Sequence, residues 1–258
     1  MPSRSFFISM DPYHRLFRRT SITVAATLVA VVLSYYFVDR AVAFAVHSHG
    51  VAKTEFAFGE VQVPIFKWLT YPPPIAQTWS PLVFAALMFR RLWGPLKHWE
   101  KTLLVACLSL MVANEFRTSI GDICGRYWPE TWFNADPQSP GPNNPSLIGT
   151  GAYGFHPFYL GSIGGDIGSF PSGHSARIVG FAAVWWIAVP RSRRLCALVA
   201  LPMLISLVAM NYHFVSDVIA GSVLGGIVGA YAVRMARLDI TRIHSAQINH
   251  SLSTAGST

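Results

Sequence analysis

The chain has 258 residues, of which 52% are apolar and only 12% are charged, and its formal net charge is +8. Its mean hydropathy is positive, at +0.39. This composition excludes a soluble enzyme and predicts a membrane protein. We expect the positive charge to reflect membrane topology and attraction to anionic lipids rather than binding to nucleic acid.

Apolar runs in the sequence predict six membrane-spanning helices, and therefore an all-α integral membrane bundle. The second and third runs are shorter than the roughly 20 residues that cross a bilayer, so these spans must extend into flanking sequence. The six runs are 21–38, 77–89, 102–113, 174–189, 195–210 and 218–233. The predicted membrane domain, 21–237, lies between a basic cytoplasmic tail at 1–20 and a polar tail at 238–258.

The first apolar run has an alternative interpretation. A basic segment precedes it, and Ala41-Val42-Ala43 is similar to the small-residue cleavage site of a secretory signal peptide. An uncleaved anchor is favoured because the run is longer than a usual signal core and Asp39-Arg40 interrupts it before the cleavage site. Removing this span would also break the even number of spans that the charge pattern requires.

Basic residues alternate between the segments that connect the spans. One set occupies the N-terminal tail, the connections between spans two and three and between spans four and five, and the segment after the last span. This set contains Arg4, Arg15, Arg18, Arg19, Arg90, Arg91, Lys97, Lys101, Arg191, Arg193, Arg194, Arg234, Arg237 and Arg242. The positive-inside rule predicts a multi-pass protein of the plasma membrane, or bacterial inner membrane, with both termini in the cytoplasm.

The spacing of the cysteines and of the glycines does not indicate a chemical site. The three cysteines, Cys107, Cys124 and Cys196, have no paired spacing, so neither a disulfide framework nor a metal site is indicated and no cofactor is expected. Every fourth residue from Gly221 to Gly229 is glycine. This pattern is typical of a helix-packing face, for which packing inside the bundle is favoured over dimerisation.

The longest polar interruption covers residues 130–170 and is rich in glycine, proline and aromatic residues. A connection of this length is more often functional or disordered than an idle connector. We expect it to cap a site at the extracytoplasmic face, with a disordered linker as the alternative. Residues 51–74 are expected to form a second interfacial element without a chemical role.

Two polar segments at the ends of predicted spans indicate chemistry. Ser172, in the run 170–174, is expected to cap a helix whose first free N–H groups can bind an anion such as phosphate. Further along, His213 and Asp217 are four residues apart, so a helix would place the carboxylate beside the imidazole. A carboxylate in this position fixes the histidine tautomer and supports positive charge, as a nucleophilic histidine requires.

These segments resemble two ordered motifs of the type 2 phosphatidic acid phosphatases, whose catalytic core is shared with vanadium haloperoxidases. The family's Pro-Ser-Gly-His tetrapeptide is complete at residues 171–174. Its next motif is Ser-Arg, five residues, His, three residues and Asp. Here the corresponding residues are Ser206, Leu207, His213 and Asp217, with leucine in the arginine position.

A further family motif, which precedes these two, consists of Lys, six residues and Arg-Pro. It falls on residues 121–129, where Gly121 and Trp128 stand in the basic positions and only Pro129 matches. The resemblance covers roughly residues 100–235. All three motifs fall on the predicted extracytoplasmic side, which indicates one composite site.

The resemblance implies a phosphatase that acts on a membrane-lipid phosphate monoester or pyrophosphate without a metal. It implies that His213 attacks phosphorus to form a phosphohistidine and that Asp217 holds and stabilises it. It also implies that His174 protonates the leaving oxygen and then activates water.

Other residues are expected to hold the phosphoryl oxygens. By the resemblance these are Arg126, which is the basic residue nearest to the altered motif, Ser172 and the backbone amide of Gly173. Arg117 and Arg177 are candidates to replace the missing cations, although Arg177 is equally well explained as a structural ion-pair partner. Loss of one electrostatic ligand can raise a reaction barrier by roughly 3–4 kcal/mol, so such a replacement matters for activity.

Other functions remain open. A catalytically weak or silent relative that binds lipid phosphates is favoured by Gly121, Trp128 and Leu207 and opposed by the intact histidine and aspartate set. A transporter is disfavoured because the polar groups cluster at one end of the bundle instead of following a path across it. The membrane spans favour a lipid substrate over haloperoxidase chemistry. Phosphatidate, phosphatidylglycerophosphate, a polyprenyl pyrophosphate and a lipid A phosphate all fit.

Overall fold

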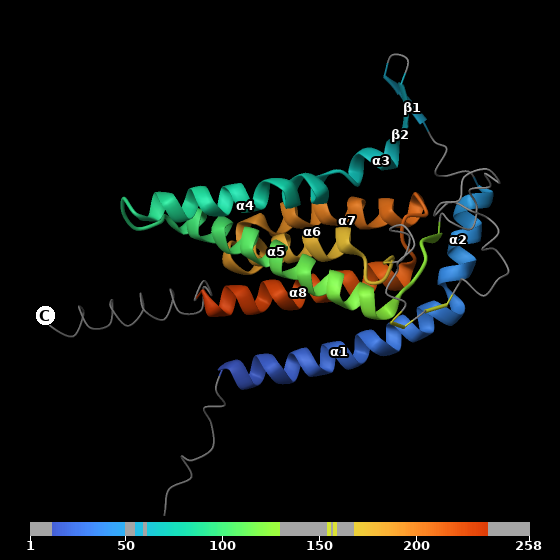
Figure 1. Ribbon diagram of the computed structural model, residues 1–258, viewed down its shortest axis with the longest axis horizontal. Coiled ribbons are helices and arrows are strands. Elements are labelled where there is room, and N and C mark those ends of the chain that lie inside the picture. The colour runs from blue at the N-terminus through green and yellow to red at the C-terminus, as the bar shows by residue number, and fades with distance from the viewer. Residues whose placement is uncertain are drawn as a thin grey trace, which may run out of the picture.

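The protein folds into an elongated bundle of helices (Figure 1). A computed structural model describes residues 12–49, 55–58, 61–129, 154–155, 157–158 and 168–236. Within these residues the long helices are α1 (Pro12–Phe37), α4 (Pro72–Arg91), α5 (His98–Cys124), α6 (Gly173–Ala188), α7 (Arg193–Ala209) and α8 (Val215–Met235). The shorter elements are α2 (Asp39–Ser48), β1 (Glu55–Phe58), β2 (Val61–Pro64), α3 (Ile65–Leu69) and the 3-10 turn η5 (Pro190–Ser192).

Each of the six predicted spans coincides with one long helix. Within the described residues, four helical segments are long and apolar enough to cross a membrane; these are His14–Phe37, His98–Cys124, Pro190–Ala209 and Val215–Met235. The short predicted third span is the largest underestimate, because α5 continues as far as Cys124. The first helix also begins earlier than predicted, at Pro12, inside the segment expected to be a tail.

Local sequence explains several helix ends. At the start of α5, the backbone N–H of Lys97 donates to the carboxylate of Glu100 over 2.7 Å, and thereby satisfies a donor at the helix start. The same helix stops at Gly125, whose φ of 55° is the left-handed conformation that glycine adopts at low cost. Asn211, with a φ of 55°, directs the chain away from α7 towards α8.

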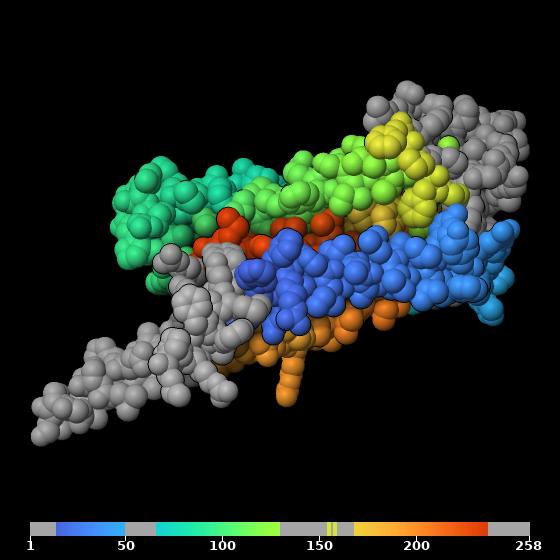
Figure 2. All heavy atoms as spheres, turned by 90° about the horizontal axis from the view of Figure 1, so that it is seen from below, coloured from blue at the N-terminus to red at the C-terminus, as the bar shows by residue number. Residues whose placement is uncertain are grey.

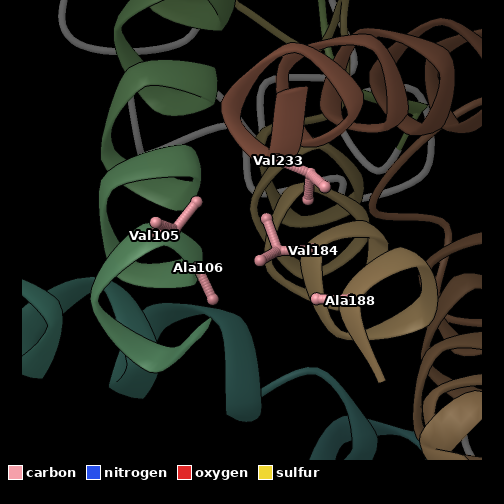
Figure 3. Packing of buried hydrophobic residues seen from close by; sticks show 5 residues of the cluster. All are labelled: Val105, Ala106, Val184, Ala188 and Val233. Carbon is pink, nitrogen blue, oxygen red and sulfur yellow. The ribbon is translucent and has the colours of Figure 1, made fainter. Parts of the chain in front are cut away.

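Helix α6 is the central helix of the described bundle and contacts α4, α5, α7 and α8. Figure 3 shows the packing where α5, α6 and α8 meet, through Val105, Ala106, Val184, Ala188 and Val233. All five side chains are buried. Their small size allows the three helices to approach closely.

The outward faces of the bundle are apolar. Leu28 on α1, Leu82 on α4 and Ile205 on α7 are each more than 60% exposed. Such an arrangement suits helices surrounded by lipid, because acyl chains favour an apolar outer face. Figure 2 shows α1 (blue) lying along the bundle, with red atoms of α8 visible between α1 and the green α5.

The structure adds one feature to the predicted all-α class. An antiparallel hairpin of β1 and β2 pairs Glu55 with Pro64 and Phe58 with Val61, between α2 and α3. It occupies the segment expected to be an interfacial element. Most of the predicted cap at 130–170 and the tail at 238–258 lie outside the described residues.

The glycines of α8 face α6, which confirms the predicted packing role. A Cβ atom on Gly221 would collide with the carbonyl oxygen of Ser172, and one on Gly225 with the carbonyl oxygen of Ala176. A Cβ atom on Gly229 would lie 2.7 Å from the Cβ of Ala183. Two helix backbones therefore come together along this face, which aligns the start of α6 with the start of α8.

The glycine face gives a test with a matched control. We expect Gly225→Ala to lower the thermal unfolding midpoint in detergent by several degrees, because the methyl group meets backbone atoms, and overpacking typically costs about 1–3 kcal/mol. Gly226→Ala is the control, since its new methyl would come no nearer than 3.9 Å to Val179. Equal midpoints for the two variants would show that close approach at Gly225 is not required.

Candidate active site

Three segments that are distant in the sequence meet at one end of the bundle. The turn after α5 joins the segment before α6, since the backbone N–H of Ser169 donates to the carbonyl oxygen of Arg126 over 3.0 Å. That segment joins α8, because the N–H of Ser172 donates to the carbonyl oxygen of Asp217, also over 3.0 Å. The structure thus brings the residues of the three sequence motifs together.

His213 lies at the centre of this site and is only 1% exposed. Its Nδ1 lies 3.0 Å from the carbonyl oxygen of Ser169. A carbonyl can only accept, so Nδ1 carries the proton and Nε2 presents its lone pair in the neutral ring. Among the described residues Nε2 has no hydrogen-bond partner. Burial lowers the pKa of His213 below its usual value, and the nearby Asp217 carboxylate opposes part of that shift.

The relation between His213 and Asp217 differs from a simple helical pair. Helix α8 begins at Val215, so the histidine precedes the helix and only the aspartate is helical. The carboxylate still reaches the imidazole, with 3.8 Å between Nδ1 and Oδ2. Oδ2 also accepts hydrogen bonds from the hydroxyl of Ser169 and from the backbone N–H of Phe214. Asp217 therefore caps its own helix while it supports the imidazole.

His174 lies on the first turn of α6, and its ring centroid is 5.9 Å from that of His213. As predicted, Ser172 caps this helix, and its Oγ accepts a hydrogen bond from the backbone N–H of Ser175 over 3.3 Å. The N–H groups of Gly173 and His174 are the first two of the helix. Such groups have no acceptor inside their own helix and are suited to an anion.

Two arginines converge on Gly173. A Cβ atom placed there would lie 3.0 Å from Nε of Arg117 and 3.1 Å from Nη2 of Arg177. Arg117 is anchored by hydrogen bonds to the carbonyl oxygens of Gly168 and Pro171. Neither arginine has a carboxylate within ion-pair distance among the described residues. Arg177 instead donates through Nε to the amide oxygen of Asn114. The structure thus places two guanidinium groups beside the histidines without a direct ion pair among the described residues, while the carboxylates of Asp122 and Asp217 act on Arg117 from a longer distance.

Arg126 is placed differently from the expectation that it grips phosphoryl oxygens. Its side chain is fully buried. Nη1 donates to Asp217 Oδ1 over 2.6 Å and to Ser216 Oγ over 2.6 Å, and Nη2 donates to Asp39 Oδ2 over 2.8 Å. Since both terminal nitrogens bind protein oxygens, this guanidinium joins Asp39 to Asp217, and its Nη groups are already engaged by the protein.

The side chain of Leu207 occupies the position of the family arginine in the last motif. It is fully buried in an apolar cluster with Ile178, Ala200 and Met203. Only its backbone contributes to the site region, since its carbonyl oxygen accepts from the N–H groups of Tyr212 and His213. The missing cation is therefore not supplied at this position.

Sequence reasoning missed Asp39, Ser169 and Ser216. Asp39 carried a usable signal, because an ionisable residue beside an apolar run is costly unless it has a partner. The serines carried none, because nothing in their local sequence separates them from other serines. Ser169 contacts both active-site partners, as its carbonyl accepts from His213 and its hydroxyl donates to Asp217.

The arrangement is suited to nucleophilic attack on an anionic group. One nitrogen of the His213 imidazole is held by a carbonyl and a carboxylate, and the other has no hydrogen-bond partner in the described part of the chain. Cationic and N–H groups lie near Gly173. No group of three histidine, cysteine, aspartate or glutamate side chains in the described part of the chain is placed to hold a metal ion.

Comparisons with known proteins connect this geometry to a family. One solved structure, a transmembrane PAP2-type phosphatidylglycerolphosphate phosphatase from Bacillus subtilis, is 17% identical over 86% of this chain and 94% of that chain, with a TM-score of 0.47. No curated protein matches the sequence. The sequence profile of the PAP2 superfamily matches residues 102–240, which include all three motif segments. Because this match covers more than half of the chain, the protein belongs to the PAP2 superfamily.

Proposed function

We propose that the protein is a membrane-embedded phosphatase of lipid phosphates or pyrophosphates that acts through a histidine nucleophile. Its family and its apolar helices support a lipid phosphatase in a membrane. The observation that carries the finer assignment is the buried Nε2 of His213, which has no hydrogen-bond partner among the described residues while Nδ1 is held in place.

In the first step, Nε2 of His213 attacks phosphorus. A P–N bond forms, and the P–O bond to the lipid breaks. His174 transfers a proton to the leaving oxygen, and a bound phosphate favours the protonated form of His174 through its negative charge. Asp217 stabilises the positive charge that the His213 ring acquires, because its carboxylate lies 3.8 Å from Nδ1.

In the second step, water attacks the phosphohistidine. His174 is now neutral and takes the proton from that water, the P–N bond breaks, and inorganic phosphate leaves. Phosphoryl transfer depends chiefly on positioning and charge stabilisation. In our proposal Arg117, Arg177 and the amide of Gly173 supply this stabilisation, with Ser172 holding the helix start.

A second function retains support from one observation. The side chain in the arginine position of the last motif, Leu207, is fully buried in the apolar core. A relative that binds lipid phosphates without hydrolysing them is consistent with this loss. An assay of phosphate release from a panel of lipid phosphates, by the purified protein in detergent, distinguishes the two functions. Release supports the phosphatase, and binding without release supports the second function.

The nucleophile assignment predicts that His213→Ala abolishes phosphate release while the protein still folds. We also expect activity to persist in EDTA, since neither step uses a metal ion. The measurement is phosphate release with equal amounts of folded protein, judged by gel filtration. Near-normal activity of the variant, or loss of activity in EDTA with recovery on adding Mg²⁺, would refute the mechanism.

The proposed cradle predicts that Arg177→Ala lowers kcat/KM about 100-fold or more, as loss of an electrostatic transition-state ligand does. Arg177→Lys should recover only part of the activity, because an ammonium group cannot grip two oxygens as a guanidinium does. Arg40→Ala serves as a control, since Arg40 is exposed and lies over the ring of Phe44. Wild-type kinetics for Arg177→Ala would remove this residue from the cradle.

The proposed topology places the site on the extracytoplasmic side and both termini in the cytoplasm. Single cysteines introduced at Phe158 and Arg191, both exposed, test it in a variant that lacks the native cysteines. An impermeant thiol reagent added to intact cells should label the cysteine at 158 and not the one at 191. The reverse pattern would invert the orientation.

A further inference from the structure

We infer that Asp39 is a charge-balancing and positioning residue for the active-site histidine, acting through Arg126 and Asp217. The catalytic part of this inference rests on the proposed function. Asp39 lies at the start of α2, outside the residues that match the family profile, and its side chain is fully buried. Arg126 is 87 positions further along the sequence, and an N–H group of its guanidinium donates to the Asp39 carboxylate.

Four hydrogen bonds saturate the Asp39 carboxylate. Oδ1 accepts from the hydroxyl of Ser34 over 2.8 Å and from the backbone N–H of Ser216 over 2.9 Å. Oδ2 accepts from Arg126 and from the hydroxyl of Ser216. Both oxygens of this carboxylate therefore face two donors each, and one of the four donors is cationic.

Arg126 is enclosed as completely as its carboxylate partners. Its guanidinium carbon lies 4.0 Å from the ring centroid of Phe214, 5.0 Å from that of Phe155 and 5.4 Å from that of Tyr35. These aromatic rings exclude water and add cation–π attraction. Buried charges interact far more strongly than exposed ones because the surrounding dielectric is low.

The sum of these charges gives Asp39 its role. Asp39 and Asp217 contribute two negative charges and Arg126 contributes one positive charge, so the buried cluster carries a net charge of −1. Without Asp39, the positive charge of Arg126 would cancel that of Asp217. With Asp39 present, one unit of negative charge remains to stabilise the positive charge that forms on the His213 ring.

Other charged groups also face His213. Arg117 of α5 and His174 of α6 contribute repulsion in the protonated state, and Arg177 adds to the positive field around His174. These groups oppose protonation of the His213 ring. Among the described residues Asp217 is the negative group that acts directly on His213, and Asp39 reaches the histidine only through Arg126 and Asp217.

Two variants separate charge from structure. Asp39→Asn keeps the size of the side chain and changes the cluster charge from −1 to 0. The double variant Asp39→Asn/Arg126→Met restores −1, because it removes one charge of each sign. Asp122→Asn is the control, since it makes the same substitution at an exposed carboxylate at the end of α5.

The first readout is the pKa of His213, measured by NMR titration of labelled histidines in detergent. Loss of negative charge disfavours the imidazolium, so Asp39→Asn should lower this pKa by about one unit, a tenfold change in the protonation equilibrium. The double variant and Asp122→Asn should keep the wild-type value. A neutral His213 is required for attack, so the acidic limb of the kcat/KM profile should move to lower pH in Asp39→Asn alone.

The second readout is turnover. We expect kcat of Asp39→Asn to fall about 10-fold, because the phosphohistidine loses charge stabilisation, and expect the double variant to recover most of it. An unchanged His213 pKa in folded Asp39→Asn overturns the inference, as does a shifted pKa in the double variant. Failure of Asp39→Asn to fold also contradicts it, since Arg126 keeps its ion pair with Asp217 in that variant.

The NMR readout keeps this inference separate from the proposed function. Wild-type protein that releases no phosphate from any lipid phosphate would refute the phosphatase. The His213 pKa series would still decide whether Asp39 sets the charge at the histidine.

Discussion

One buried guanidinium holds together the end of the bundle at which the motif residues meet. Arg126 binds Asp39 of α2 and Asp217 of α8 at distances of 2.8 and 2.6 Å, with all three side chains fully buried. A charge placed in such an environment is strongly destabilising unless it is compensated. The two ion pairs of Arg126 therefore constrain three parts of the backbone. These are the turn after α5, the start of α8 and the junction of α1 with α2.

The helix packing makes that contact possible. Glycines on α8 allow its backbone to lie against α6, and this close approach brings the N-terminal turns of both helices side by side. The histidines of these two segments then lie with ring centroids 5.9 Å apart. Apolar small residues at the centre of the bundle thus determine a polar geometry at its end, because rigid helices transmit their alignment along their length.

The sequence predicted what depends on local pattern. Apolar runs predicted the long helices, the sequence predicted Ser172 as the cap of α6, and motif spacing singled out His174, His213 and Asp217, which the fold brings together. Arg126 was misplaced because its position near Pro129 suggested a substitute phosphate ligand, and local spacing does not reveal that two carboxylates compete for the same guanidinium. The contribution of Asp39 was also missed, since its partners are 87 and 177 residues away and only the tertiary fold joins them.

The separation of Asp39 from its partners also has a consequence for biogenesis. During translation the first helix enters the membrane long before Arg126 has been synthesised, and Ser216 and Asp217 follow only with the last helix. Until Arg126 is in place Asp39 remains an uncompensated carboxylate, which is costly away from water and favours a position at the aqueous interface. Its full set of hydrogen bonds has to await the last helix, because two of its four donors belong to Ser216.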